Sequence, residues 1–223
     1  GKIVLLAQRY TDKVIVCDDG SKDMTADIAA NLGAIVVKHE RNMGYGAAIQ
    51  TLFRKARELD ADVMVTLDGD GQHDPHEIPV LTEAILEGKA DVTIGSRFLG
   101  DLTKNNNVPR YRRMGIKVIT RLTGATSNYE VSDAQSGFRA YSRKAVKCLG
   151  LYENGMGVSV EVLMEARKHG LTVVEVPIRC NYHGLDKTST HGSFRHGASV
   201  VMSIVRSVVE ERPLVFLGVP GLV

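Results

Sequence analysis

Two acidic residues separated by a single glycine are the groups in this sequence best placed to do chemistry. Asp68 and Asp70 lie in the stretch Asp-Gly-Asp-Gly-Gln, directly after the apolar run 63–67. Ligands of α/β proteins bind at the carboxyl ends of the strands, where such loops converge. Carboxylates at this spacing suit a hard divalent ion such as Mg²⁺, which usually binds one or two carboxylates together with substrate phosphates. Taken alone, the motif indicates an acidic turn without a ligand equally well.

A second acidic pair follows another apolar run. Asp18 and Asp19 come after residues 14–17 and are followed by Gly20 and Ser21. This arrangement repeats the pattern of a strand that ends in carboxylates. The sequence therefore predicts two acidic loops at strand ends.

A basic segment, residues 103–121, contains lysines and arginines but no acid. Guanidinium groups bind phosphate oxygens through two parallel N–H donors, so such a segment suits a phosphate-bearing substrate. Anionic lipid head groups would add roughly 1 kcal/mol for each nearby basic residue. The alternative is a solvated helix face. We favour a phosphate site, because the segment follows a Gly-Ser-Arg sequence at a predicted strand end.

In this order, the motifs resemble the family 2 glycosyltransferases with the GT-A fold. The similarity is greatest to polyprenyl-phosphate sugar synthases of the dolichyl-phosphate mannose or glucose synthase type. It extends over about residues 1–190. The segments that carry it are Asp18-Asp19-Gly20-Ser21, Asn42-x-Gly44-x-Gly46, Asp68-Gly-Asp-Gly-Gln72-His73, Gly95-Ser96-Arg97-Phe98, Arg112-Arg113, Asp133-Ala-Gln-Ser136-Gly137-Phe138-Arg139 and His183-Gly-Leu-Asp-Lys187.

The resemblance implies a donor side of the site. Metal ligands for Mg²⁺ or Mn²⁺ would be Asp68, Asp70 and Gln72. The residues implied to bind the nucleotide are Asp18, Asp19, Gly20, Ser21, Asn42, Gly44, Asp68 and Lys187.

It also implies an acceptor side. The acceptor-binding residues would be Arg97, Arg112, Arg113 and Ser136. The residues expected to carry the catalytic roles are Asp70, Arg97, Arg112 and Asp133.

The activity that this resemblance implies is the inverting transfer of a hexose from GDP-mannose or UDP-glucose to a polyprenyl (dolichyl) phosphate. A phosphate monoester is already anionic near neutral pH, so it needs no general base. Asp133 would serve as the base if the acceptor were a hydroxyl group. A helix cap before Gln135 is the other interpretation of Asp133.

Three alternatives remain open from the sequence. A soluble family 2 transferase with a sugar-hydroxyl acceptor would keep the donor site but need a base. A nucleotidyltransferase would lack the basic acceptor segment and the tail. A nucleotide-binding fragment without activity is the third.

The elements that must position these residues alternate along the chain. Strands are predicted at 14–17, 34–38, 63–67, 91–95 and 172–178, and helices at 23–32, 45–59, 77–87 and 159–169. Such alternation predicts an α/β domain of the GT-A (Rossmann-like) type, with a mostly parallel sheet flanked by helices.

Both ends of the sequence depart from this alternation. Residues 1–11 are predicted to be a helix, so the first strand of the fold is expected to be missing. Residues 193–211 have apolar side chains at helical spacing, and basic residues lie around them. We expect a catalytic domain over 1–190 and an amphipathic, membrane-proximal helix with an apolar end over 191–223. This predicts a protein at the cytoplasmic face of a membrane.

Composition agrees with a folded domain. The chain has 223 residues, 43% apolar, with a formal net charge of +2, which is too small for nucleic-acid binding through bulk charge. Its three cysteines are far apart, which argues against a disulfide framework or a zinc site. The sequence leaves a homo-oligomer possible.

Overall fold

The computed structural model describes residues 1–99, 129 and 131–180. The predictions for Arg112, Arg113, Lys187 and the amphipathic segment 193–211 fall outside these residues. No helix in the described ranges is long and apolar enough to cross a membrane.

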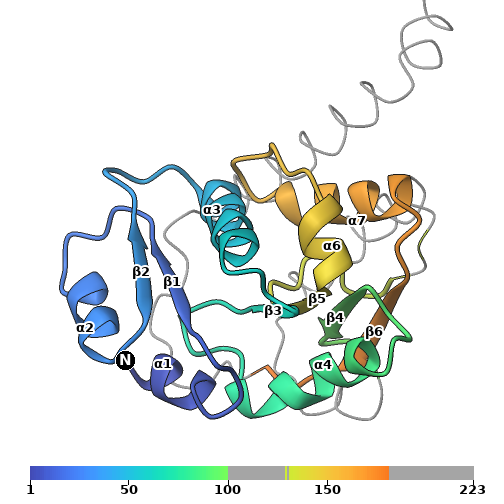
Figure 1. The fold of residues 1–223 in the computed structure, drawn as a ribbon, viewed down its shortest axis with the longest axis horizontal. Helices are drawn as coiled ribbons and strands as arrows, with labels where there is room; N and C mark the ends of the chain where they lie inside the picture. The colour runs from blue at the N-terminus through green and yellow to red at the C-terminus, as the bar shows by residue number, and fades with distance from the viewer. Residues whose placement is uncertain (100–128, 130, 181–223) are drawn as a thin grey trace, which may run out of the picture.

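Six strands in the described residues form two sheets (Figure 1). In the smaller sheet, β1 (Ile15–Asp18) pairs in parallel with β2 (Ile35–Lys38). The larger sheet has the order β3-β5-β4-β6. Its strands are β3 (Val63–Thr66), β4 (Val92–Ser96), β5 (Arg139–Ser142) and β6 (Val173–Pro177).

Strand β5 runs antiparallel to both of its neighbours, whereas β4 and β6 are parallel. Strands β3, β4 and β6 therefore share one direction, as predicted, and β5 opposes them. The sequence analysis missed β5. All five strands that it did predict are present, and their bounds shift by at most two residues.

The helices cover both faces of the larger sheet. Those that belong to the described residues are α1 (Lys2–Ala7), α2 (Thr25–Asn31), α3 (Tyr45–Glu58), α4 (Ile78–Leu86), α6 (Arg143–Cys148) and α7 (Val158–Lys168), with a short 3₁₀ turn, η1, at Pro75–Glu77. Figure 1 shows α3, α6 and α7 on one side and α4 on the other. The α/β class is confirmed.

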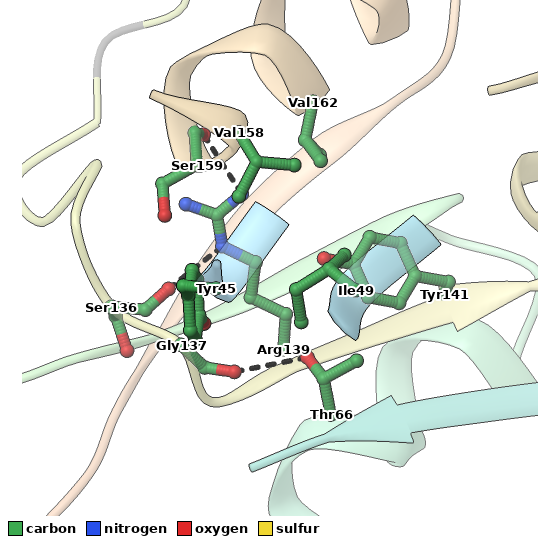
Figure 2. Close-up of a pocket in the computed structure, with 10 residues that line it drawn as sticks. All are labelled: Tyr45, Ile49, Thr66, Ser136, Gly137, Arg139, Tyr141, Val158, Ser159 and Val162. Carbon is green, nitrogen blue, oxygen red and sulfur yellow. Dashed lines mark hydrogen bonds between the residues drawn. The ribbon is translucent and has the colours of Figure 1, made fainter. Parts of the chain in front are cut away.

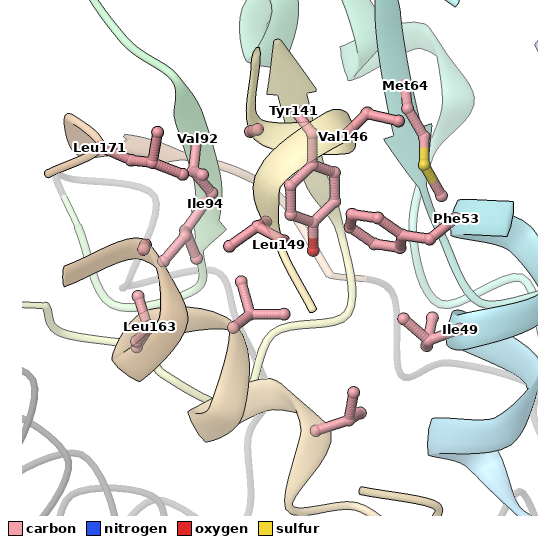
Figure 3. Close-up of a cluster of buried hydrophobic side chains, with 14 of the residues drawn as sticks. Ile49, Phe53, Met64, Val92, Ile94, Tyr141, Val146, Leu149, Leu163 and Leu171 are labelled. Carbon is pink, nitrogen blue, oxygen red and sulfur yellow. The ribbon is translucent and has the colours of Figure 1, made fainter. Parts of the chain in front are cut away.

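Apolar side chains fill the space on each face. On the α3, α6 and α7 side, Phe53 packs edge-on against Tyr141, with 4.9 Å between the ring centroids (Figure 3). On the α4 side, Leu81 packs with Phe138 and Ile178. All five of these side chains are at most 2% exposed, and burying each one fully contributes about 1.5–3 kcal/mol. These two clusters hold the strand ends in fixed positions.

Candidate functional site

Strand β5 brings the loop before it against the acidic loop after β3. In the antiparallel register Thr66 pairs with Arg139, so Asp68 and Gly137 continue past that pair. A Cβ atom on Gly137 would lie 3.0 Å from Asp68 Oδ2 and 2.7 Å from Tyr45 Oη. Three segments therefore meet here: the end of β3, the approach to β5 and the start of α3. Glycine leaves open the space beside the carboxylate of Asp68.

Asp68 and Asp70 have the character of a cation site. Burial, and to a lesser degree the charge of Asp70, raises the pKa of Asp68 to about 6, while Arg97 acts in the opposite direction. A cation between the carboxylates would relieve their repulsion. Within the described ranges, no cluster of three or more His, Cys, Asp or Glu side chains could hold a metal. A bound ion would therefore complete its shell with substrate or water oxygens, as Mg²⁺ commonly does.

A local hydrogen bond closes the turn that begins at Asp70. The backbone N–H of Gln72 donates to Asp70 Oδ1 at 2.9 Å. The side-chain Oε1 of Gln72 lies 4.0 Å from Cys180 Sγ. The ring of His73 is buried, and its centroid lies 5.2 Å from that of Phe138. The structure thus places Gln72 beside the acidic pair, with its side-chain oxygen next to Cys180.

The two acids after β1 differ in their surroundings. Asp19 accepts hydrogen bonds from the N–H groups of Met43 at 2.8 Å and Gly44 at 2.9 Å, and from His39 Nδ1 at 2.7 Å. Burial opposes ionisation of Asp19, but these hydrogen bonds together lower its pKa. Asp19 therefore holds the 42–44 turn in place.

Asp18 is the acid that still has an unused oxygen. Its Oδ1 accepts the N–H of Ser21 at 2.9 Å, while its buried Oδ2 has no partner among the described residues. A buried carboxylate oxygen without a donor is costly unless a ligand or water supplies one. Of the two acids after β1, Asp18 is thus the one with an oxygen left for a ligand.

The two glycines of the Asn-x-Gly-x-Gly motif allow the backbone at the start of α3 to lie close to neighbouring backbone segments. Gly44 has φ of +103°, and its N–H donates to Asp19. A Cβ atom on Gly46 would lie 2.0 Å from the carbonyl oxygen of Glu153, and the N–H of Gly46 donates to Asn154 O at 2.8 Å. The start of α3 is therefore pressed against the loop that precedes α7. Asn42, predicted to bind the nucleotide, is exposed at the edge of this turn.

We expect Gly46→Ala to destabilise the protein by at least about 2 kcal/mol, because the new methyl group would overlap backbone atoms that cannot move aside easily. Urea unfolding would measure this. Gly150→Ala is the matched control, since its Cβ would meet nothing closer than 3.4 Å. Equal unfolding midpoints for the two variants would contradict this account of the motif.

Arg97 and Asp133 form a bidentate ion pair, which the sequence analysis did not foresee. Arg97 Nε donates to Asp133 Oδ2 at 2.6 Å, and Nη2 donates to Oδ1 at 2.7 Å. The side chain of Asp133 is 0% exposed and that of Arg97 is 13% exposed. Asp133 thus binds Arg97 instead of capping a helix.

Arg139 fixes the loop between Asp133 and Gly137. Its buried guanidinium donates to the carbonyl oxygens of Ser136 at 2.9 Å, Ala134 at 2.6 Å and Ser159 at 3.0 Å. Figure 2 shows it extending from β5 toward the start of α7. It lines a cavity of about 10 Å³, room for roughly one water molecule. Ser136, predicted to bind the acceptor, is 1% exposed. Arg139 therefore fixes the backbone around Ser136, whose side chain has almost no exposed surface.

The structure brings together part of the predicted site. Asp68, Arg97, Asp133 and Ser136 lie around the converging ends of β3, β4 and β5. Arg139, which belongs to a quoted motif, and Glu175 were assigned no role from the sequence, yet both hold the backbone of the loop before β5. An available signal for Glu175 was a lone charge inside the apolar run of β6.

The chain is similar in sequence to known glycosyltransferases. The family model for "Glycosyl transferase family 2" matches residues 4–150, and the chain belongs to this family. The prediction from the motifs is therefore confirmed.

Named relatives narrow the comparison. The chain is 35% identical over 190 residues to a UDP-N-acetylglucosamine–dolichyl-phosphate N-acetylglucosaminyltransferase of Methanococcus voltae, covering 77% of this chain and 75% of the relative. It is 33% identical over 215 residues to a dolichyl-phosphate hexose transferase of Haloferax volcanii, covering 95% and 89%.

A solved structure shares the fold. Glucosyl-3-phosphoglycerate synthase from Mycobacterium tuberculosis, in complex with Mn²⁺, UDP and glucosyl-3-phosphoglycerate, superposes with a TM-score of 0.68 at 20% identity. The match covers 92% of this chain and 73% of that one. The predicted GT-A type of fold is confirmed.

Proposed function

We propose that this glycosyltransferase moves a sugar from a nucleotide diphosphate sugar to a polyprenyl phosphate, with inversion at the anomeric carbon. The observation that carries the proposal is the Arg97–Asp133 pair next to Asp68. It presents a cation, held in one orientation, beside a site for the metal and diphosphate. The names of the two relatives, both dolichyl-phosphate transferases, support this acceptor class.

On the donor side, Asp68 and Asp70 would hold Mg²⁺ or Mn²⁺. The ion would neutralise the charge that develops on the leaving diphosphate. Asp18 would accept a hydrogen bond from the nucleoside through its unused Oδ2. Asp19 keeps the neighbouring turn closed through three hydrogen bonds. The nucleobase and the sugar of the donor stay a prediction; we expect GDP-mannose or UDP-glucose.

On the acceptor side, the phosphate oxygen would attack the anomeric carbon from the face opposite the diphosphate. Arg97, and Arg112 and Arg113 by sequence, would bind and orient that phosphate. Both oxygens of Asp133 accept from Arg97 and the residue is fully buried, which suits a positioning role better than that of a base. A phosphate acceptor needs no base, so this geometry favours it over a sugar hydroxyl.

Arg97→Lys tests the acceptor role while keeping a positive charge beside Asp133. Lysine lacks the planar fork, so we expect the apparent KM for polyprenyl phosphate to rise about tenfold, the effect of losing a charge-assisted hydrogen bond of roughly 1.5–3 kcal/mol. The KM for the nucleotide sugar should stay within about twofold of its original value, because the lost hydrogen bond goes to the acceptor.

Arg143→Lys is the control for this experiment. Arg143 also binds carboxylates through several N–H donors, at 2.7 Å to Asp60 and 2.6 Å to Asp62, but at the exposed start of α6. Its replacement should leave both KM values unchanged. A rise in the donor KM of Arg97→Lys equal to that of the acceptor would show that Arg97 does not act on the acceptor.

A polyprenyl acceptor resides in a bilayer, so we extend the proposal to a membrane surface. The basic segment and the amphipathic segment 193–211 would make the contact. Flotation with anionic liposomes, comparing the chain with a version that ends at Lys187, checks this. We expect the shorter version to bind less. Equal recovery of both in the soluble fraction at low salt would contradict it.

A further inference from the structure

Strand β6 carries one acidic side chain, Glu175, that faces the loop holding Asp133. Its Oε2 accepts the N–H of Ser132 at 2.6 Å, and its Oε1 accepts the N–H of Asp133 at 2.9 Å. Glu175 pairs with Ile94 of β4 in the parallel register, so it stands on the strand next to the one that leads to Arg97. A single carboxylate therefore holds two successive peptide groups.

These contacts continue to the guanidinium of Arg97. Asp133 is held by its backbone from Glu175, and it holds Arg97 by its side chain at 2.6 and 2.7 Å. The hydroxyl groups of Ser132 and Ser96, 2.6 Å apart, join the same loop to the end of β4. The carboxylate of Glu175, on β6, thus fixes the position of Arg97 through Asp133 and without direct contact.

A carboxylate at this place is costly for a sheet. Burial raises the pKa of Glu175 even though the hydrogen bonds from Ser132 and Asp133 oppose the shift. Neighbouring positions of β6 carry valine, which would pack without that cost. The contact that Glu175 makes in return is the double hydrogen bond to the Ser132–Asp133 backbone.

We propose that Glu175 is a positioning residue for the acceptor, acting through Asp133 to set the orientation of Arg97. The inference rests on the proposed binding of the acceptor phosphate by Arg97. It predicts that damage to the Glu175 carboxylate affects the acceptor selectively, although Glu175 lies behind Asp133 and touches no substrate.

Glu175→Gln is the direct test. A glutamine side chain has only one acceptor oxygen, so one of the two backbone N–H groups loses its partner. We expect the apparent KM for polyprenyl phosphate to rise about tenfold and the KM for the nucleotide sugar to stay within about twofold, an effect close to that of Arg97→Lys. Combined with Arg97→Lys, the second change should add little, because both act on one contact.

Glu161→Gln is a matched control. The Glu161 carboxylate also accepts two successive backbone N–H groups, from Tyr152 at 2.9 Å and Glu153 at 3.0 Å, and burial raises its pKa as well. It lies on α7 and has no contact with the Arg97–Asp133 pair. We expect Glu161→Gln to lower the unfolding midpoint about as much as Glu175→Gln without changing the acceptor KM.

Glu175→Asp guards against a variant that does not fold. It keeps the charge and both oxygens on a shorter side chain, and should raise the acceptor KM by a smaller factor, about threefold. The inference is overturned if Arg97→Lys raises the acceptor KM but neither Glu175 variant does, or if Glu161→Gln raises it equally. An unchanged acceptor KM in Arg97→Lys would instead overturn the proposed role of Arg97 itself.

Discussion

Asp70→Asn is expected to reduce sugar transfer about a thousandfold, the consequence of losing several kcal/mol of electrostatic stabilisation of the departing diphosphate. Asp70 is exposed in the loop after β3, and among the described residues its Oδ1 accepts the nearby N–H of Gln72. The fold should therefore be unaffected. Calorimetry should show that Mn²⁺ no longer strengthens the binding of UDP or GDP.

Asp74→Asn is the control from the same loop. Asp74 is exposed and accepts the N–H of His76 at 3.0 Å, a capping contact that asparagine can also make. Asp74→Asn removes one negative charge, as Asp70→Asn does, but four residues further along the chain. Sugar transfer should therefore remain near its original rate. Unchanged nucleotide affinity of Asp70→Asn in the presence of Mn²⁺ would show that Asp70 holds no metal.

Asp133→Ala is expected to cost about 3–5 kcal/mol of stability, since it leaves the mostly buried guanidinium of Arg97 without its counter-charge. Replacing both members, with Asp133→Leu and Arg97→Met, should recover much of this loss because no uncompensated charge remains. Chemical unfolding of the single and double variants measures the difference.

Asp62→Ala provides the comparison. Asp62 pairs with Arg143 at 2.6 Å, as close as Asp133 with Arg97, but its side chain is 86% exposed. Solvent screening makes such a pair weak, so its loss should shift the unfolding midpoint far less. Equal shifts for Asp62→Ala and Asp133→Ala would mean that burial of the Arg97–Asp133 pair has no energetic consequence.

The alternation of apolar runs was sufficient to predict five of the six described strands. Those strands are rich in valine and isoleucine, and β4 is buried along its whole length. Strand β5 escaped detection because its sequence, Arg-Ala-Tyr-Ser, has no valine or isoleucine, begins with a charged arginine and follows a polar loop. Its place in the sheet depends on pairing with β3 and β4, contacts that are far apart in the sequence.

The candidate site was also predictable only where its residues lie close to one another in the sequence. Motif order identified Asp68, Asp70 and Arg97, which follow strands directly. It did not show that Asp133 pairs with Arg97, because the two are 36 residues apart. Local sequence also gave no sign that His39 and the distant 42–44 turn would occupy Asp19 while Asp18 keeps an unused oxygen. Those distinctions depend on hydrogen-bond partners, which only the folded chain supplies.

Together these contacts separate the site into two parts. The proposed donor side consists of acids on short loops whose charges would be balanced by a cation. The proposed acceptor side consists of an arginine that is anchored through Asp133 to β6. An anionic acceptor would meet a fixed positive group, and the negative diphosphate would meet the metal. This division is what the proposed reaction requires of its two phosphate-bearing substrates.

Incubating the chain with polyprenyl phosphate and radiolabelled nucleotide sugars, each with and without Mn²⁺, tests the proposed sugar transfer directly. GDP-mannose, UDP-glucose and UDP-N-acetylglucosamine cover the donors in question. We expect label from one of them to pass into an organic extract only when both Mn²⁺ and polyprenyl phosphate are present, and we expect Asp70→Asn to abolish this transfer. Label that appears only in water-soluble products, with or without polyprenyl phosphate, would show that the proposed acceptor is wrong.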